Sequence, residues 1–144
     1  MRQWLNRAAL LGTGLLMVAC THTQKNDSDL STRLTTQSWQ IEYIAGDGVI
    51  DYSPAQLTFA ADGQFFGNGS CNRIFGRYTL EGDKLQIADD IGSTRMSCPP
   101  ALMNQEARLV SVLPGVHRIR WENGILFMTD SSGAPTLQAA AVSP

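Results

Sequence analysis

Short runs of alternating apolar and polar residues, separated by glycine-containing turns, recur through most of this chain. In the run 38–44, the side chains of Trp39, Ile41 and Tyr43 fall on one face of an extended strand. An Asn-Gly pair at 123–124 is one of several turn signals that join two such runs as a hairpin. Short strands that follow one another as successive hairpins are typical of antiparallel sheets. The pattern therefore predicts a mainly β fold.

One segment has a helical period instead. Two prolines follow Cys98, where the first turn of a helix tolerates them, and Pro114-Gly115 supplies a stop signal. We therefore expect an α+β fold, in which a strongly curved, barrel-like antiparallel sheet of about seven or eight strands packs with one α-helix. The residues at helical spacing are Leu102, Glu106, Leu109, Val110 and Leu113.

Residues 1–20 have the features of a bacterial lipoprotein signal. Arg2 and Arg7 precede an apolar run at 8–18, and the small Ala19 precedes Cys20. The run is shorter than the roughly 20 apolar residues that a membrane-spanning helix needs. We interpret residues 1–19 as a signal peptide and Cys20 as the acylated first residue of the mature chain, which anchors it to a membrane.

The residues after this cysteine divide into a tether and a domain. Residues 20–36 are polar and lack aromatic side chains, so we interpret them as a lipidated, flexible tether. Residues 37–142 are expected to form a single folded domain. By resemblance to the sorting rule of such lipoproteins, Thr21 favours the outer membrane, with the domain facing the periplasm.

Charge and cysteine content narrow the possible functions. With 11 Lys and Arg against 13 Asp and Glu, the net charge of −2 argues against a nucleic-acid partner. We predict a monomer without a cofactor or metal.

Cys71 and Cys98 remain once Cys20 is acylated, and an even pair in an oxidising compartment favours a disulfide. Two free thiols, packed or metal-binding, are the alternative, although His22 and His117 do not have the spacing of co-ligands.

Catalytic patterns are sparse. The chain has no phosphate-binding glycine loop ahead of a helix and no Gly-x-Ser-x-Gly nucleophile motif. Asp89 and Asp90 are adjacent, so their side chains point apart, and His117 has no identifiable partner nucleophile. Arg118 and Arg120 share one face of a predicted strand. That face is either an anion-binding surface or a solvated surface that protects a sheet edge.

Two consecutive phenylalanines raise the question of a contact surface. Phe65 and Phe66 lie in one predicted strand, so their side chains point to opposite faces and one of them leaves the core. Together with Tyr78 or Trp121, an exposed phenylalanine would mark a site of contact with another molecule. Core packing is the alternative for these side chains.

Several short motifs follow one another along the chain. They are a tryptophan in the first strand, a Cys-Asn turn, a Gly-x-Tyr strand, and a Thr-x-Met-x-Cys stretch ahead of the helix. Together they resemble the META domain. The member type of this family that they resemble most is the HslJ-like, heat-shock-inducible lipoprotein. Ser70 departs from the family pattern, which has glycine before the cysteine of the turn. The matching residues are Trp39, Cys71, Asn72, Gly76, Tyr78, Thr94, Met96, Cys98 and Glu106.

The resemblance implies a family that is not known as enzymatic and is linked to envelope stress and antibiotic tolerance. Our hypothesis is a non-catalytic, lipid-anchored envelope protein that binds a partner protein or a small hydrophobic molecule. One alternative is an envelope hydrolase that uses Glu106 with Asp89 or Asp90. Another is an assembly chaperone for an envelope or secretion machine, with Phe65 or Phe66 in an exposed groove.

Overall fold

The computed structural model describes residues 23–142, which form ten strands, two α-helices and one 3-10 helix. The signal peptide and the acylated Cys20 expected from the sequence lie outside these residues. The helices are α1 (Thr23–Thr36), α2 (Pro100–Val112) and the 3-10 helix η1 (Leu113–Gly115). The strands are β1 (Ser38–Ile44), β2 (Asp47–Gly48), β3 (Gln56–Phe59), β4 (Gln64–Asn68), β5 (Arg73–Glu81), β6 (Lys84–Ile87), β7 (Gly92–Ser93), β8 (Arg118–Glu122), β9 (Ile125–Thr129) and β10 (Pro135–Val142).

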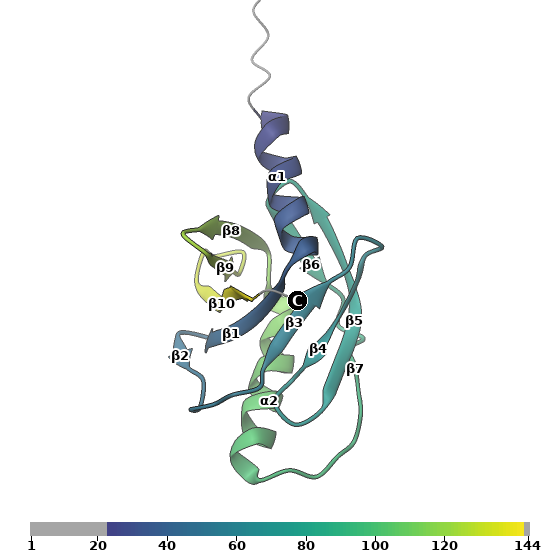
Figure 1. Cartoon of the computed structure of the whole chain (residues 1–144), viewed down its shortest axis with the longest axis vertical. Coiled ribbons are helices and arrows are strands. Elements are labelled where there is room, and N and C mark those ends of the chain that lie inside the picture. The colour runs from purple at the N-terminus through teal and green to yellow at the C-terminus, as the bar shows by residue number, and fades with distance from the viewer. Residues whose placement is uncertain (1–22, 143–144) are drawn as a thin grey trace, which may run out of the picture.

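All ten strands belong to one strongly curved antiparallel sheet (Figure 1). The strand order is β10-β9-β8-β6-β5-β4-β3-β1-β2, and β1 also pairs with β10, so the sheet is ring-like. The mainly β fold expected from the alternating runs is confirmed. The two strands beyond the expected number are β2 and β7, which have two residues each and therefore show no alternation in the sequence.

Strand β1 corrects one expectation about the core. Trp39 and Ile41 are buried, but Tyr43 is 43% exposed, and Ile44 takes its place inside with 1% exposure. The cause is a shift in register against β10 between Ile41 and Tyr43. The extra residue of such a bulge reverses the side-chain alternation beyond it. The strand itself lies where the sequence predicts it.

The residues assigned to a flexible tether form α1 from position 23 onward, which the sequence analysis did not predict. Leu34 is fully buried, and Leu30 packs against the same core. Leu30 and Leu34 lie one helical turn apart and thus share a face of α1. The carbonyl oxygen of Leu34 accepts a hydrogen bond of 3.0 Å from Trp39 Nε1, which fixes the end of α1 to β1. The domain therefore begins before residue 37.

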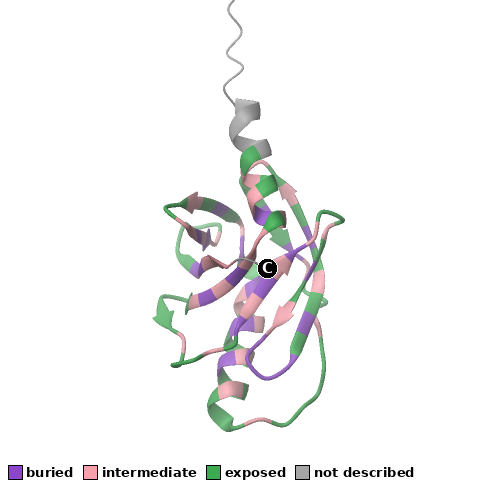
Figure 2. Ribbon diagram, viewed as in Figure 1, coloured by how far each residue is buried: buried purple, intermediate pink, exposed green. Residues whose placement is uncertain are grey.

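The predicted helix after the two prolines is α2, with a proline at its start. Gln105 and Leu109 are its buried residues, and Figure 1 shows α2 extending toward the opposite end of the molecule from α1. Within residues 23–142, neither α-helix has the length and apolar character needed to cross a bilayer. Figure 2 shows buried and exposed residues alternating along the strands. The largest fully buried side chains include Trp39, Phe59, Phe65, Ile41, Leu57, Ile74 and Leu109.

Candidate functional site

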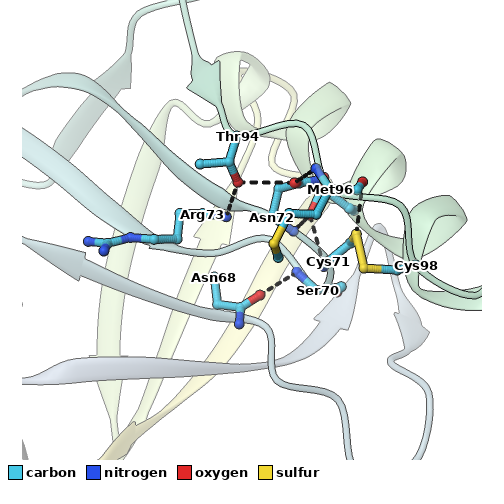
Figure 3. Close-up of a disulfide and its surroundings, with 9 residues drawn as sticks. Asn68, Ser70, Cys71, Asn72, Arg73, Thr94, Met96 and Cys98 are labelled. Atoms are coloured by element: carbon cyan, nitrogen blue, oxygen red, sulfur yellow. Dashed lines mark hydrogen bonds between the residues drawn. A yellow bond between two sulfur atoms is a disulfide. The ribbon is translucent and has the colours of Figure 1, made fainter.

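Most of the motif residues come together where the turn between β4 and β5 meets α2 (Figure 3). We call this group the motif cluster. Its members come from three segments far apart in the sequence: the turn, the stretch between β7 and α2, and the middle of α2. The motif cluster consists of Cys71, Asn72, Thr94, Met96, Cys98 and Glu106.

A disulfide joins two of these segments. Cys71 and Cys98 form the bond, with their Cα atoms 5.8 Å apart. Of the alternatives that the sequence left open, the structure therefore has the disulfide rather than two free thiols. Among the residues that the structure describes, no group of three or more His, Cys, Asp or Glu side chains could hold a metal ion.

Asn72 occupies the centre of the motif cluster. Its Oδ1 accepts hydrogen bonds from Thr94 Oγ1 at 3.0 Å and from the backbone N–H of Met96 at 2.6 Å. Its Nδ2 donates to Glu106 Oε1 at 2.8 Å. One buried amide thus connects the stretch after β7 to α2. Met96 takes part in the motif cluster through its backbone N–H, whereas its side chain is exposed.

Glu106 fastens α2 to the turn. Its Oε2 accepts hydrogen bonds from the backbone N–H groups of Cys71 at 2.9 Å and of Asn72 at 2.5 Å. Hydrogen bonds to an ionised acceptor are stronger than those between neutral groups. The turn approaches so closely that a Cβ on Gly69 would lie 2.8 Å from Glu106 Oε2. The carboxylate therefore acts as a structural clamp.

Ser70 shows the cost of its departure from the family pattern. Its φ of 129° lies in a region that favours glycine, so a serine there is strained. Its buried hydroxyl forms a hydrogen bond of 2.7 Å with Nε2 of Gln105, and its backbone N–H donates to Asn68 Oδ1 at 2.9 Å. These two bonds hold the turn in the conformation that glycine adopts more easily.

Three motif residues lie apart from the motif cluster. Trp39 meets Trp121 edge to face, with ring centroids 5.5 Å apart. Tyr78 packs edge to face on Phe59, and its hydroxyl donates to the carbonyl oxygen of Ala60 at 2.6 Å. Gly76 lies against the ring of Phe65. All three serve the packing of the core, so the motif as a whole is a folding signature.

Gly76 gives a direct test of this packing. A Cβ on Gly76 would lie 2.6 Å from Cε1 and 2.9 Å from Cζ of Phe65. We expect Gly76→Ala to lower the free energy of unfolding by about 1–3 kcal/mol, because the buried ring must shift. Urea unfolding measures the change. The control is Gly115→Ala, whose Cβ meets nothing within 4 Å; an equal loss in both variants would contradict the packing explanation.

Tyr78 makes stability depend on alkaline pH. Burial raises the pKa of its hydroxyl above the ordinary 10.0, and the charge of Asp62 raises this pKa further. The folded state therefore holds the proton more tightly than the unfolded chain. The contribution of the neutral Tyr78 hydroxyl to stability is complete below about pH 10, and it is lost as the pH rises through the pKa of Tyr78 in the folded state.

We expect Tyr78→Phe to be about 1 kcal/mol less stable than the native chain at neutral pH, because the hydrogen bond to Ala60 is lost. Above about pH 10 the difference in free energy of unfolding between the native chain and Tyr78→Phe should narrow. Ionisation of Tyr78 favours the unfolded state of the native chain, whereas the variant has no hydroxyl there to ionise. Urea unfolding at a series of pH values measures both chains. Stability curves that stay parallel throughout would contradict the pKa shift.

The carboxylates considered for a hydrolase do not form one site. Asp89 lines an open cleft of about 890 Å³, together with Asp62 and His117. Glu106 is held in the motif cluster by its three hydrogen bonds. Asp90 forms an exposed ion pair of 2.8 Å with Arg77. The structure thus brings neither Asp89 nor Asp90 to Glu106. Asp62, which the sequence did not single out, lines the same cleft as Asp89.

The two arginines on β8 are paired with carboxylates. Arg118 binds Asp83 at 2.7 Å. Arg120 binds Glu122, and its guanidinium lies 4.1 Å from the centre of the Phe127 ring. β8 pairs with β9 along its length but with β6 only at Arg118, so among the described residues the side of β8 beyond Arg118 has no strand partner. The positive charges are compensated in these ion pairs, and edge protection stays a prediction for Arg120.

An exposed aromatic pair lies on the outer face of β4 and β5. Phe65 is buried, whereas Phe66 is 45% exposed, as the alternation predicts. Directly across the ladder from Phe66 stands Phe75, which is 53% exposed and rests against Gly92. The sequence places Phe66 and Phe75 on either side of the Cys-Asn turn, but sequence reasoning did not pair them, although the register of the β4–β5 hairpin sets them opposite each other. We call these two residues the Phe66–Phe75 face.

Comparisons with known proteins give a family and a fold. The family model described as META domain matches residues 32–143. An NMR structure of a protein from Burkholderia xenovorans has a TM-score of 0.62 and 20% identity, with 100% of both chains covered. A second NMR structure has a TM-score of 0.60 and 21% identity, covering 76% of this chain and 92% of that one.

The third similar structure is a crystal structure of a duf4847 family protein from Bacteroides vulgatus. Its TM-score is 0.57 at 13% identity, covering 80% of this chain and 99% of that one. At these identities the three structures show the fold alone. No curated protein matches the chain.

Proposed function

This chain belongs to the META domain family, and on that premise we propose that it is a non-catalytic, lipid-anchored protein of the bacterial envelope that binds a partner protein. The proposed role is in envelope stress or antibiotic tolerance. Lipidation of Cys20 would hold the domain at the outer membrane, on the periplasmic side. Support for the anchor comes from the positive residues, the apolar run and the Ala-Cys pair at the start of the sequence.

The use of the motif residues supports a role in folding rather than in catalysis. Glu106 would have to give up three hydrogen bonds, two of them to backbone N–H groups of the turn, before it could act as a general acid or base. Asn72 and Thr94 are equally engaged. A group that holds the fold together in this way is poorly suited to exchange protons with a substrate.

The observation that carries a binding role is the Phe66–Phe75 face. Both side chains are large and apolar, and both remain about half exposed on adjacent strands. Apolar surface left in water contributes nothing to folding. Aromatic residues are enriched at the centres of protein interfaces, where a few such anchors supply most of the binding free energy. A partner that covers both rings would therefore gain from their burial.

The test replaces both anchors and leaves the core untouched. We expect Phe66→Ser with Phe75→Ser to keep the melting temperature within a few degrees and to lower affinity for the partner about 30-fold or more. Cells that carry the native chain or the variant are treated with a cross-linker, and the complexes and the antibiotic tolerance are compared. The control is Met103→Ser, an exposed apolar residue on α2. Equal complexes and equal tolerance in all three strains would contradict the proposal.

A further inference from the structure

The turn between β2 and β3 presents a tyrosine whose conformation gives no benefit to the fold. Tyr52 is fully exposed, and its φ of 58° lies in the left-handed region that bulky residues rarely adopt. Such strain persists only where surrounding contacts impose it, and it is concentrated at functional sites. A glycine or asparagine would occupy the same position with less strain. The tyrosine side chain therefore needs an explanation outside folding.

Hydrogen bonds from two glutamines hold this turn rigid. Nε2 of the buried Gln105 donates to Ser53 Oγ at 2.6 Å, and its Oε1 accepts from the backbone N–H of Ile50 at 2.7 Å. Nε2 of Gln40 donates to the carbonyl oxygen of Ser53 at 2.9 Å. The exposed ring is thus presented on a fixed backbone. A preorganised surface loses less conformational entropy on binding than a mobile one.

Beside Tyr52 lies a shallow hollow of about 560 Å³. Tyr43, which the bulge in β1 turns outward, forms part of its wall with Ile50. The charged residues that line it are Glu42 and Asp51, and both are acidic. Within the described part of the chain, neither of these two carboxylates has a hydrogen-bond or ion-pair partner. Aromatic rings beside unpaired carboxylates form a site suited to a cation.

We propose that the Tyr43–Tyr52 hollow binds an arginine or lysine side chain from an extended segment of a partner protein. The cation lies against a tyrosine ring and pairs with Glu42 or Asp51, while the aliphatic part of the side chain packs on Ile50. An anionic lipid surface is disfavoured, because the carboxylates repel it. This site goes beyond the proposed function, since it shares no residue with the Phe66–Phe75 face. In Figure 1 the β2–β3 connection lies in the part of the domain away from α1.

The experiment selects peptides from a random library against the immobilised full-length protein and measures the affinity of those selected. We expect the selected peptides to carry arginine or lysine. Their affinity should fall about tenfold or more in Glu42→Gln with Asp51→Asn, and similarly in Tyr52→Asn. The matched control is Glu81→Gln with Asp89→Asn, which neutralises one glutamate and one aspartate outside the hollow. Binding to the control should change less than twofold.

Stability supplies a second readout. Tyr52→Asn should leave the melting temperature unchanged or raise it by a few degrees while it weakens binding, because asparagine tolerates the left-handed conformation. Retained binding by the Phe66→Ser, Phe75→Ser variant separates this site from the proposed function. The proposal is overturned if the selection yields no peptide or only peptides without basic residues. It is also overturned if all variants bind equally, or if Tyr52→Asn melts several degrees lower.

Discussion

Replacing both Cys71 and Cys98 with serine lowers the free energy of unfolding by about 3–4 kcal/mol, which corresponds to a fall of roughly 10–20 °C in melting temperature. The bond joins residues 27 positions apart, so its removal gives the unfolded chain the freedom of a loop of that length. The same change removes the covalent link between the turn before β5 and the stretch ahead of α2, which remain joined by the hydrogen bonds of Asn72. Thermal unfolding followed by circular dichroism measures the effect.

Reductant provides the control for this prediction. The native chain in reductant should approach the melting temperature of the double serine variant, whereas the variant itself should not respond to reductant. A native melting curve that is the same under oxidising and reducing conditions would show that the disulfide contributes no stability. Because the two serines leave no thiol at these positions, thiol-dependent aggregation from them cannot account for the loss.

Glu106→Ala is expected to cost about 2–4 kcal/mol. The variant leaves the backbone N–H groups of Cys71 and Asn72 without their acceptor, together with the side-chain amide of Asn72. An unsatisfied donor in a half-buried site costs more than the net value of the bond that it loses. Since the disulfide still joins the turn to the chain ahead of α2, the variant should fold and unfold cooperatively. Urea unfolding gives the free energy directly.

Glu81→Ala is the matched control, because Glu81 is an exposed glutamate on β5. Its stability should remain within about 0.5 kcal/mol of the native chain. A double-mutant cycle with Asn72→Ala adds a second check. If Glu106 acts through Asn72, the two losses should be less than additive. Equal stability of the Glu81 and Glu106 variants would mean that the carboxylate is not a clamp.

The strands were predictable because each long strand buries one face. Alternation in β1, β3, β4 and β5 reproduces the observed burial until a bulge intervenes. The bulge that exposes Tyr43 leaves no trace in the local sequence, because it depends on the register of β1 against β10, about 95 residues away. Helix α1 was missed for a different reason. Its polar composition suggested a tether, and only the spacing of Leu30 and Leu34 indicated a buried face.

The candidate site was predictable only in part. Cysteine count favoured the disulfide, but nothing local to Asn72 or Glu106 shows that a turn and a helix 34 residues apart meet there. Their pairing depends on tertiary packing, and the family resemblance gave the residues without their roles. The exposed surfaces were harder to predict than the motif cluster. Phe66 and Phe75 become a pair only through the β4–β5 register. Tyr52 stands out because of its positive φ angle, which residue type does not reveal.

Mass spectrometry of the full-length protein, gently extracted from its own membranes, tests the central claim most directly. A lipid-anchored binding protein predicts a chain that starts at Cys20, carries the acyl chains of a mature lipoprotein and lacks the two hydrogens lost in forming the disulfide. Under native conditions it should also retain the mass of a bound partner. A species that keeps residues 1–19 and carries no lipid would contradict the account.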